Sequence, residues 1–187
     1  MSKHRQRPAR QPEPGRSEVV WVRADPTPLG AGYMLTVEFS DDDVLPLSGA
    51  DMLDYVATMS DALARAQYAE AVRRQLRDQF KMREDMMMST LIQLRESWPE
   101  LRRFGRYEIR PCVSIEGRTS VDVWLGDRNL VQFAGDQLRE HIAYVLHVYA
   151  IADLDSAYRR FLVGQVGIDK GAASLCVSTL NRHVREE

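Results

Sequence analysis

The residues best suited to bind a charged ligand are two arginine pairs in a repeated motif, Ala-x-Arg-Arg-x-Leu. One copy holds Arg73 and Arg74, and the other holds Arg159 and Arg160. A guanidinium group binds phosphate or carboxylate through a fork of N–H donors. The motif therefore indicates an anion-binding site. The alternative is that these side chains lie on solvated helix faces and form ion pairs within the chain.

A second candidate is the basic N-terminal arm, residues 1–17, which is rich in proline and has almost no apolar residue. It contains one acidic residue, Glu13, and five basic residues: Lys3, Arg5, Arg7, Arg10 and Arg16. The arm carries +4, and because the whole chain carries −2, residues 18–187 carry −6. We expect a disordered arm that binds nucleic acid or an acidic partner in a salt-dependent way. The alternative is a solubilising tail without a partner.

Two tryptophans are candidates for a protein interface. Trp21 and Trp124 fall on the polar side of alternating segments, so we expect both on the outer face of a sheet. An exposed tryptophan is a common centre of a protein contact. The alternative is that further chain covers that face.

No sequence signature of catalysis or metal binding is present. The chain has no nucleophile elbow, HExxH, P-loop or GxGxxG motif. His141 and His147 lie six residues apart on an expected helix, so they point in nearly opposite directions and cannot share a metal. Residues 164–178 resemble the turn of a helix-turn-helix, but the second helix offers no cluster of Arg, Asn or Gln to read bases. We expect no enzyme activity, no metal and no cofactor.

The composition is that of a water-soluble globular protein, with 44% hydrophobic and 28% charged residues in 187. We expect no signal peptide, no membrane span and no membrane partner. Cys112 and Cys176 show no paired spacing, which favours a reducing cytoplasm. Arginine outnumbers lysine by 22 to 3, which is typical of a GC-rich coding genome.

The chain also repeats itself. Residues 34–76 and 120–162 align without a gap at an offset of 86, with ten identities in 43 positions. Ordinary composition gives roughly three matches over such a window. We interpret the repeat as a tandem duplication in which each copy needs the other to bury its apolar face. Residues 86–91 also resemble residues 175–180 at an offset of 89, which predicts extra length near residues 164–171.

Each half begins with strands and continues with helices. Alternating apolar and polar residues predict strands over residues 18–24, 33–39, 44–47, 107–115, 119–125 and 130–133. A long helix follows Ser48, a good helix cap, and another begins at about Gly135. Residues 81–85 interrupt the apolar stripe of the first, so we expect one long or kinked helix there, and a helix stop followed by a new helix at the glycines after residue 163.

These features predict an α+β fold, a pseudo-two-fold tandem duplication of a three-stranded meander followed by one or two helices, with antiparallel sheet or sheets on long helices. We expect the arm over residues 1–17, repeat 1 over residues 18–98, a linker over residues 99–106 and repeat 2 over residues 107–187, with one shared core.

The charge distribution and the missing catalytic motifs predict a non-catalytic binding or regulatory protein of phage or mobile-element origin. It would engage nucleic acid or an acidic protein partner through its arm and helix arginines. One alternative is a self-associating structural or assembly protein that uses the apolar second-half helix or the tryptophans. The other is an enzyme whose site lies between the repeats.

Overall fold

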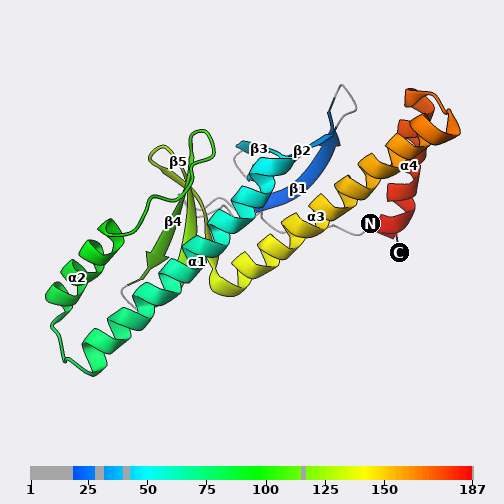
Figure 1. Ribbon diagram of the computed structural model, residues 1–187. Coiled ribbons are helices and arrows are strands. Elements are labelled where there is room, and N and C mark those ends of the chain that lie inside the picture. Colours follow the sequence, from blue (N-terminus) through cyan, green and yellow to red (C-terminus); the bar gives the residue numbers. More distant parts are fainter. Residues whose placement is uncertain (1–18, 28–31, 40–42, 115–116, 187) are drawn as a thin grey trace, which may run out of the picture.

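The computed structural model describes residues 19–27, 32–39, 43–114 and 117–186. Within these residues the chain forms two similar runs of strands and helices (Figure 1). The first run consists of β1 (Val19–Pro26), β2 (Tyr33–Phe39), β3 (Val44–Ser48), α1 (Gly49–Asp78) and α2 (Glu84–Glu96). The second consists of β4 (Tyr107–Val113), β5 (Thr119–Leu125), β6 (Arg128–Ala134), α3 (Gly135–Phe161), a π-helical turn (Leu162–Val166) and α4 (Lys170–Glu186).

Each run opens with a three-stranded antiparallel meander, so the described strands form two separate sheets. Alternation turns one face of each sheet inward, and the central strands bury Leu35, Val37, Val121 and Val123 completely. Long helices pack against both sheets. The predicted α+β class and the packing of antiparallel sheets on long helices are therefore confirmed.

α1 begins where the sequence predicts. The Oγ of Ser48 accepts a hydrogen bond from the backbone N–H of Asp51 at 3.2 Å, which satisfies a first-turn amide. The helix then runs for 30 residues and ends at Asp78. The chain turns at Lys81, whose φ of +49° is left-handed, and α2 begins at Glu84. The expected long or kinked helix is thus two separate helices.

The second helix of each half begins at the same offset of 86, at Glu84 in α2 and at Lys170 in α4. The predicted extra length near residues 164–171 was therefore wrong. At this offset Met87 corresponds to Ala173, and both are fully buried, whereas the offset of 89 matches Met87 with an exposed residue. The predicted stop is confirmed at Gly167, whose φ is +78°.

Each long helix packs on the sheet of the other half as well as on its own. α1 packs against β4 and β5, and α3 packs against β1 and β2. The helices lie side by side and antiparallel, because Gly49 at the start of α1 approaches Tyr149, and Gly135 at the start of α3 approaches Leu63 (Figure 1). One cluster of buried residues consequently extends through both halves.

A buried polar contact joins the two helices within this cluster. The Oη of Tyr55 on α1 lies 3.0 Å from Nε2 of His141 on α3, and the two residues are themselves 86 positions apart. The imidazole also stacks on Phe133, with ring centroids 4.7 Å apart. Burial lowers the pKa of His141 to about 4, so the ring is neutral in the folded protein at pH 7.

We predict that acid destabilises the fold through His141. Between pH 6.5 and about pH 4 the unfolded chain protonates this imidazole and the folded chain does not, so stability falls as the pH is lowered through that window. One pKa unit corresponds to about 1.4 kcal/mol, so the loss of stability approaches about 3 kcal/mol at the acid end of this window. Urea unfolding at pH 7 and pH 4.5 measures it.

The His141→Gln variant provides the control for this prediction. Gln cannot take up the proton, and carboxylates titrate alike in both proteins, so the variant should lose less stability than the wild type on acidification. Equal losses in the two proteins would contradict the assignment to His141.

Candidate functional site

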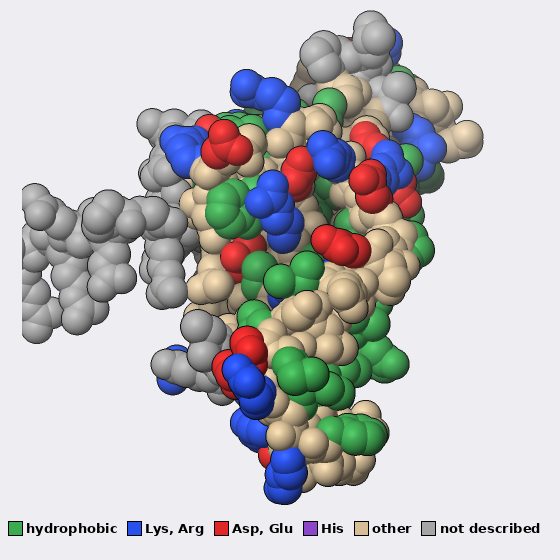
Figure 2. Space-filling model, turned by 90° about the vertical axis from the view of Figure 1, so that its left-hand side faces the viewer, with side chains coloured by type: hydrophobic (Ala, Val, Ile, Leu, Met, Phe, Trp, Pro, Cys, Tyr) green, Lys and Arg blue, Asp and Glu red, His purple; other side chains and the backbone are tan. Residues whose placement is uncertain are grey.

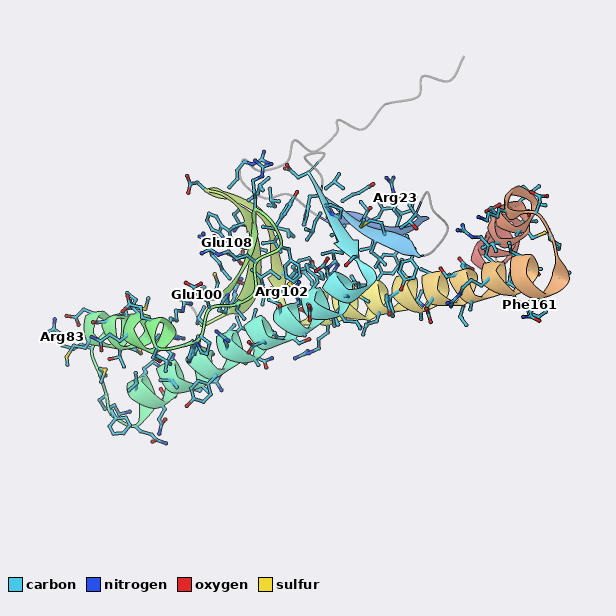
Figure 3. All side chains as sticks on the ribbon, turned by 45° about the horizontal axis from the view of Figure 1, so that its top comes forward. Arg23, Arg83, Glu100, Arg102, Glu108 and Phe161 are labelled. Atoms are coloured by element: carbon cyan, nitrogen blue, oxygen red, sulfur yellow. The ribbon has the colours of Figure 1, made fainter. Side chains whose placement is uncertain are left out.

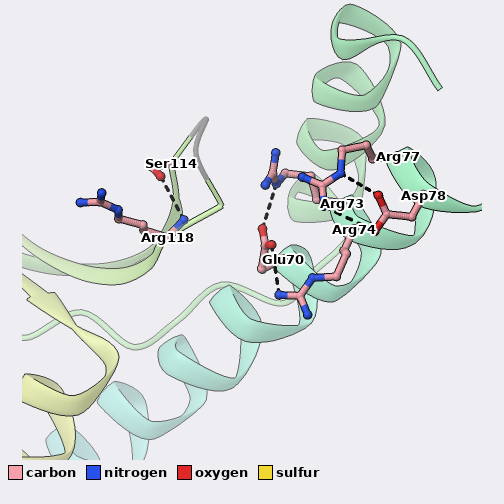
Figure 4. A network of polar contacts seen from close by, with 7 residues as sticks. All are labelled: Glu70, Arg73, Arg74, Arg77, Asp78, Ser114 and Arg118. Atoms are coloured by element: carbon pink, nitrogen blue, oxygen red, sulfur yellow. Dashed lines mark hydrogen bonds and ion pairs between the residues drawn. The ribbon is translucent and has the colours of Figure 1, made fainter. Parts of the chain in front are cut away.

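The first arginine pair lies where the β4–β5 hairpin meets α1 (Figure 4). The Nε of Arg73 donates to Oε2 of Glu70 at 2.8 Å, and both residues are buried. Arg74 extends into solvent, and its Nη2 lies 3.5 Å from Oε1 of Glu70. Gly117 of the hairpin rests directly on Glu70 and Arg73. The ion pair of Glu70 and Arg73 therefore lies between α1 and the hairpin.

The second arginine pair lies far from the first. Because α1 and α3 are antiparallel, their C-terminal ends point in opposite directions (Figure 1). Arg159 is half-buried, and Arg160 is exposed with its Nε donating to the carbonyl oxygen of Ser156 at 3.3 Å. The structure therefore does not bring the two pairs together. The arm residues Lys3, Arg5, Arg7, Arg10 and Arg16 lie outside the described residues.

Both tryptophans lie on outer sheet faces, but in different sheets and in different surroundings. Trp21 is 44% exposed, and its Nε1 donates to Oε2 of Glu38 at 2.6 Å. Trp124 is half-buried beneath the guanidinium of Arg110, which lies 4.6 Å from the ring centroid. The ring of Trp21 is thus accessible to a partner, whereas one face of the Trp124 ring is covered by the Arg110 guanidinium in a cation–π contact.

A polar cluster occupies the outer face of the second sheet around Asp122, which is only 5% exposed. Its carboxylate accepts hydrogen bonds from four neighbours at 3.1–3.4 Å: Cys112, Ser120, Asn129 and Gln132. Burial and the adjacent carboxylate raise the pKa of the Cys112 thiol to about 12. The cluster stabilises the sheet, and its thiol is a poor nucleophile.

The described surface also contains a groove of about 360 Å³. One wall follows the end of α2 and the residues after it, from Arg95 to Arg103, and Arg65 of α1 contributes as well. The other wall consists of four consecutive residues of β4, 108–111. Because side chains alternate along a strand, four consecutive lining residues place the groove along the edge of β4, which pairs only with β5 in its sheet.

The groove is rich in charge, with four arginines and three glutamates: Arg65, Arg95, Arg103, Arg110, Glu96, Glu100 and Glu108. Arg110 and Arg103 pair with Glu108 at 2.7 and 2.9 Å, and the hydrogen bond from Arg110 holds the pKa of Glu108 below its usual range. Glu100 lies between α2 and the second sheet, and Glu108 lies on β4 at the side of that sheet toward α2 (Figure 3). The groove therefore contains a preformed ion-pair network.

An aromatic side chain and one available cation complete the groove. The guanidinium of Arg65 lies 5.8 Å from the ring centroid of Trp98 and pairs with Asp61 at 2.8 Å. Arg95 has no ion-pair partner among the residues that the structure describes. On the face of the molecule that includes α2, positive and negative side chains alternate, with hydrophobic ones between them (Figure 2). This face is thus not a single-sign patch.

Comparison of the chain with protein-family models, with curated proteins and with solved structures gave no match. No helix in the described part of the chain is apolar over a length that could cross a membrane. Within the same residues, no group of His, Cys, Asp or Glu is placed to hold a metal ion.

Sequence reasoning missed the groove because residues 99–106 read as a linker. Two signals were available. Pro111 cannot donate to a neighbouring strand, which indicates an edge strand. The second signal is Trp98, directly before the expected linker. A large aromatic residue at that point indicates a contact surface rather than a simple connection.

We predict that Gly117→Ala destabilises the protein by about 3 kcal/mol, because an alanine there would be strained in the left-handed region and would displace a buried ion pair. The φ of Gly117 is +82°, and an added Cβ would overlap Arg73 and lie 2.8 Å from Oε1 of Glu70. Chemical denaturation measures the loss.

Gly126→Ala is the matched control. Its φ is +59° and an added Cβ meets nothing within 4 Å, so only the backbone cost of about 1 kcal/mol applies. If the two variants lose the same stability, the contact at Arg73 is not significant.

We predict that the two thiols react at very different rates. At pH 8 the exposed Cys176 should be alkylated quickly, whereas Cys112, with a pKa of about 12, should react about a thousandfold more slowly than an ordinary thiol. Mass spectrometry of iodoacetamide-treated native protein measures both rates. Asp122→Asn should accelerate Cys112, and an unchanged rate would refute the role of the carboxylate.

Proposed function

We propose that this chain is a non-catalytic binding protein that takes an extended segment of a protein partner into the groove along β4. The observation that carries the proposal is the groove itself, which follows an edge strand and presents arginines and a tryptophan. An edge strand offers backbone donors and acceptors to an added strand, and the flanking pockets select its side chains.

The lining residues support binding rather than catalysis. Arginines and glutamates dominate, and Glu108, which could act as a base, is already held by two arginines at 2.7 and 2.9 Å. The groove lining contains no His, Cys, Ser or Asp. A nucleophile with an adjacent base, the arrangement that covalent catalysis requires, is therefore missing from this groove.

The charges favour a peptide over a nucleic acid. Arg95 is the cation without a partner among the described groove residues, while the exposed Glu96 and Glu100 lie close by. A continuous phosphate backbone would meet these carboxylates, whereas a single acidic side chain of a peptide can reach Arg95 alone. The two arginine pairs of the repeated motif also lie far apart, so they do not form one continuous surface for a phosphate backbone.

In this proposal the basic N-terminal arm increases the rate of association by electrostatic attraction. With +4 in residues 1–17, it would draw an acidic partner toward the groove and lose its effect as salt rises. The cytoplasmic location and the mobile-element origin stay predictions.

We also propose that the two halves descend from one duplicated unit related by an approximate two-fold axis. The common offset of 86 at the starts of α1 and α3, and of α2 and α4, supports this. So does the match in burial, since Met59 and Val145 occupy equivalent positions and are both fully buried. The predicted domain boundaries stay predictions.

The prediction for function is tested with fluorescent peptides that alternate Val with Glu, Thr or Lys, which are strand formers of different charge. We expect the Val–Glu peptide to bind best in fluorescence anisotropy, and Arg95→Glu to weaken it about tenfold through repulsion. Arg83→Glu makes the same charge change at the residue that precedes α2, outside the groove. The Arg83 side chain is 79% exposed, and this variant should leave binding unchanged.

Two outcomes would overturn the proposal. One is equal binding of all three peptides, or none. The other is tighter binding of a single-stranded oligonucleotide that is lost when residues 1–17 are deleted, which would favour nucleic acid as the ligand.

A further inference from the structure

α3 carries an exposed apolar stripe on the side opposite its buried residues. Leu138, Val145 and Ala152 face the core, and the opposite side shows residues at three- and four-residue spacing: Ala143, Leu146, Ala150, Leu154, Ala157 and Phe161. The larger members of this stripe are 39%, 69% and 53% exposed at residues 146, 154 and 161. A single exposed leucine is ordinary, whereas a continuous stripe of about 27 Å indicates a contact surface.

The stripe reads the same in both directions about Ala150. A leucine lies four residues to either side, and an alanine lies seven residues to either side. In an antiparallel pair of identical helices centred on Ala150, residues equally far before and after that position share a layer. Leu146 would thus lie beside Leu154 of a second copy, and Ala143 beside Ala157. This self-matching is what a two-fold contact between identical chains requires.

The residue sizes and the ends of the stripe fit the same arrangement. Alanine at the centre lets two helix axes approach to about 8 Å, and the leucines on either side then fill the space above the alanines. Arg139 lies eleven residues before Ala150 and Phe161 eleven residues after it. Each end of the pair would therefore place a guanidinium beside an aromatic ring of the other copy.

We propose that the protein forms a homodimer through antiparallel contact of α3 with α3 of a second copy, centred on Ala150. Phe161 marks the C-terminal end of the helix, beyond the first sheet and next to the π-helical turn that leads to α4 (Figure 3). One helix pair buries less than the ~1,600 Å² of a standard interface, so the dimer is weak and dissociates on dilution.

α1 provides an internal comparison. Its equivalent stripe, at the offset of 86, is also exposed but does not match itself: Ala57, Ser60, Ala64, Tyr68 and Ala71. Ser60 would stand opposite Tyr68, which leaves a polar hydroxyl against a large ring. Ala64 and Ala150 are therefore the same residue on similar exposed surfaces, and only Ala150 lies at the proposed contact.

Sedimentation velocity of the full chain over roughly a hundredfold range of concentration tests the proposal. We expect the wild type and Ala64→Arg to shift from monomer to dimer as concentration rises, and Ala150→Arg to stay monomeric. Both variants carry the new side chain on an exposed helix surface, and circular dichroism checks that they fold. A wild type that is monomeric throughout, or two variants that behave alike, would overturn it.

Oxidative cross-linking supplies a second measurement that does not depend on charge. In a Cys176→Ser background, Ala150→Cys should form a disulfide-linked dimer, because the two-fold axis brings the two sulfur atoms together. Ala64→Cys should not. Equal cross-linking at both positions would refute the α3 contact.

Discussion

The structure depends on one reciprocal constraint, which is that each sheet packs on the long helix of the other half as well as on its own. α1 follows the first meander but packs on β4 and β5, and α3 follows the second but packs on β1 and β2. An isolated half would therefore expose part of the inner face of its sheet and part of its own helix. The hydrogen bond between Tyr55 and His141 lies where the two helices meet, so it can form only when both halves are in place.

This constraint decides how the charged residues are used. Arg73 belongs to the repeated arginine motif that suggested an anion-binding site. Instead, it forms an ion pair with Glu70 beneath the β4–β5 hairpin. The contact between this hairpin and the helix of the other half buries both charges, and they are paired because an unpaired buried charge would destabilise the fold. In the proposed function, the arginines that meet a partner lie instead along the groove.

Local patterns predicted local structure well. Alternation located β2 and β5, and the Ser48 hydroxyl marked the start of α1, because each depends on neighbours within a few residues. The number of sheets, the crossed covering and the groove were beyond reach, because they bring together residues far apart in sequence, such as Arg65, Trp98 and Arg110. Trp124 shows the limit within one strand. Alternation along β5 predicted which face of the sheet Trp124 lies on. That Arg110 covers the ring depends on how β4 pairs with β5, which local sequence does not show.

The groove and the α3 stripe lie on different parts of the molecule, and this separation has a consequence. The groove lies beside β4 and the C-terminal half of α1, while α3 extends in the opposite direction (Figure 1). A dimer through α3 would leave both grooves open. A partner with one binding segment would bind a dimer no more tightly than a monomer. A partner with two suitably spaced segments, or a repeating assembly, would bind the second groove at high effective concentration once the first is occupied. Weak self-association and modest groove affinity would then combine into a contact that forms only on a multivalent partner.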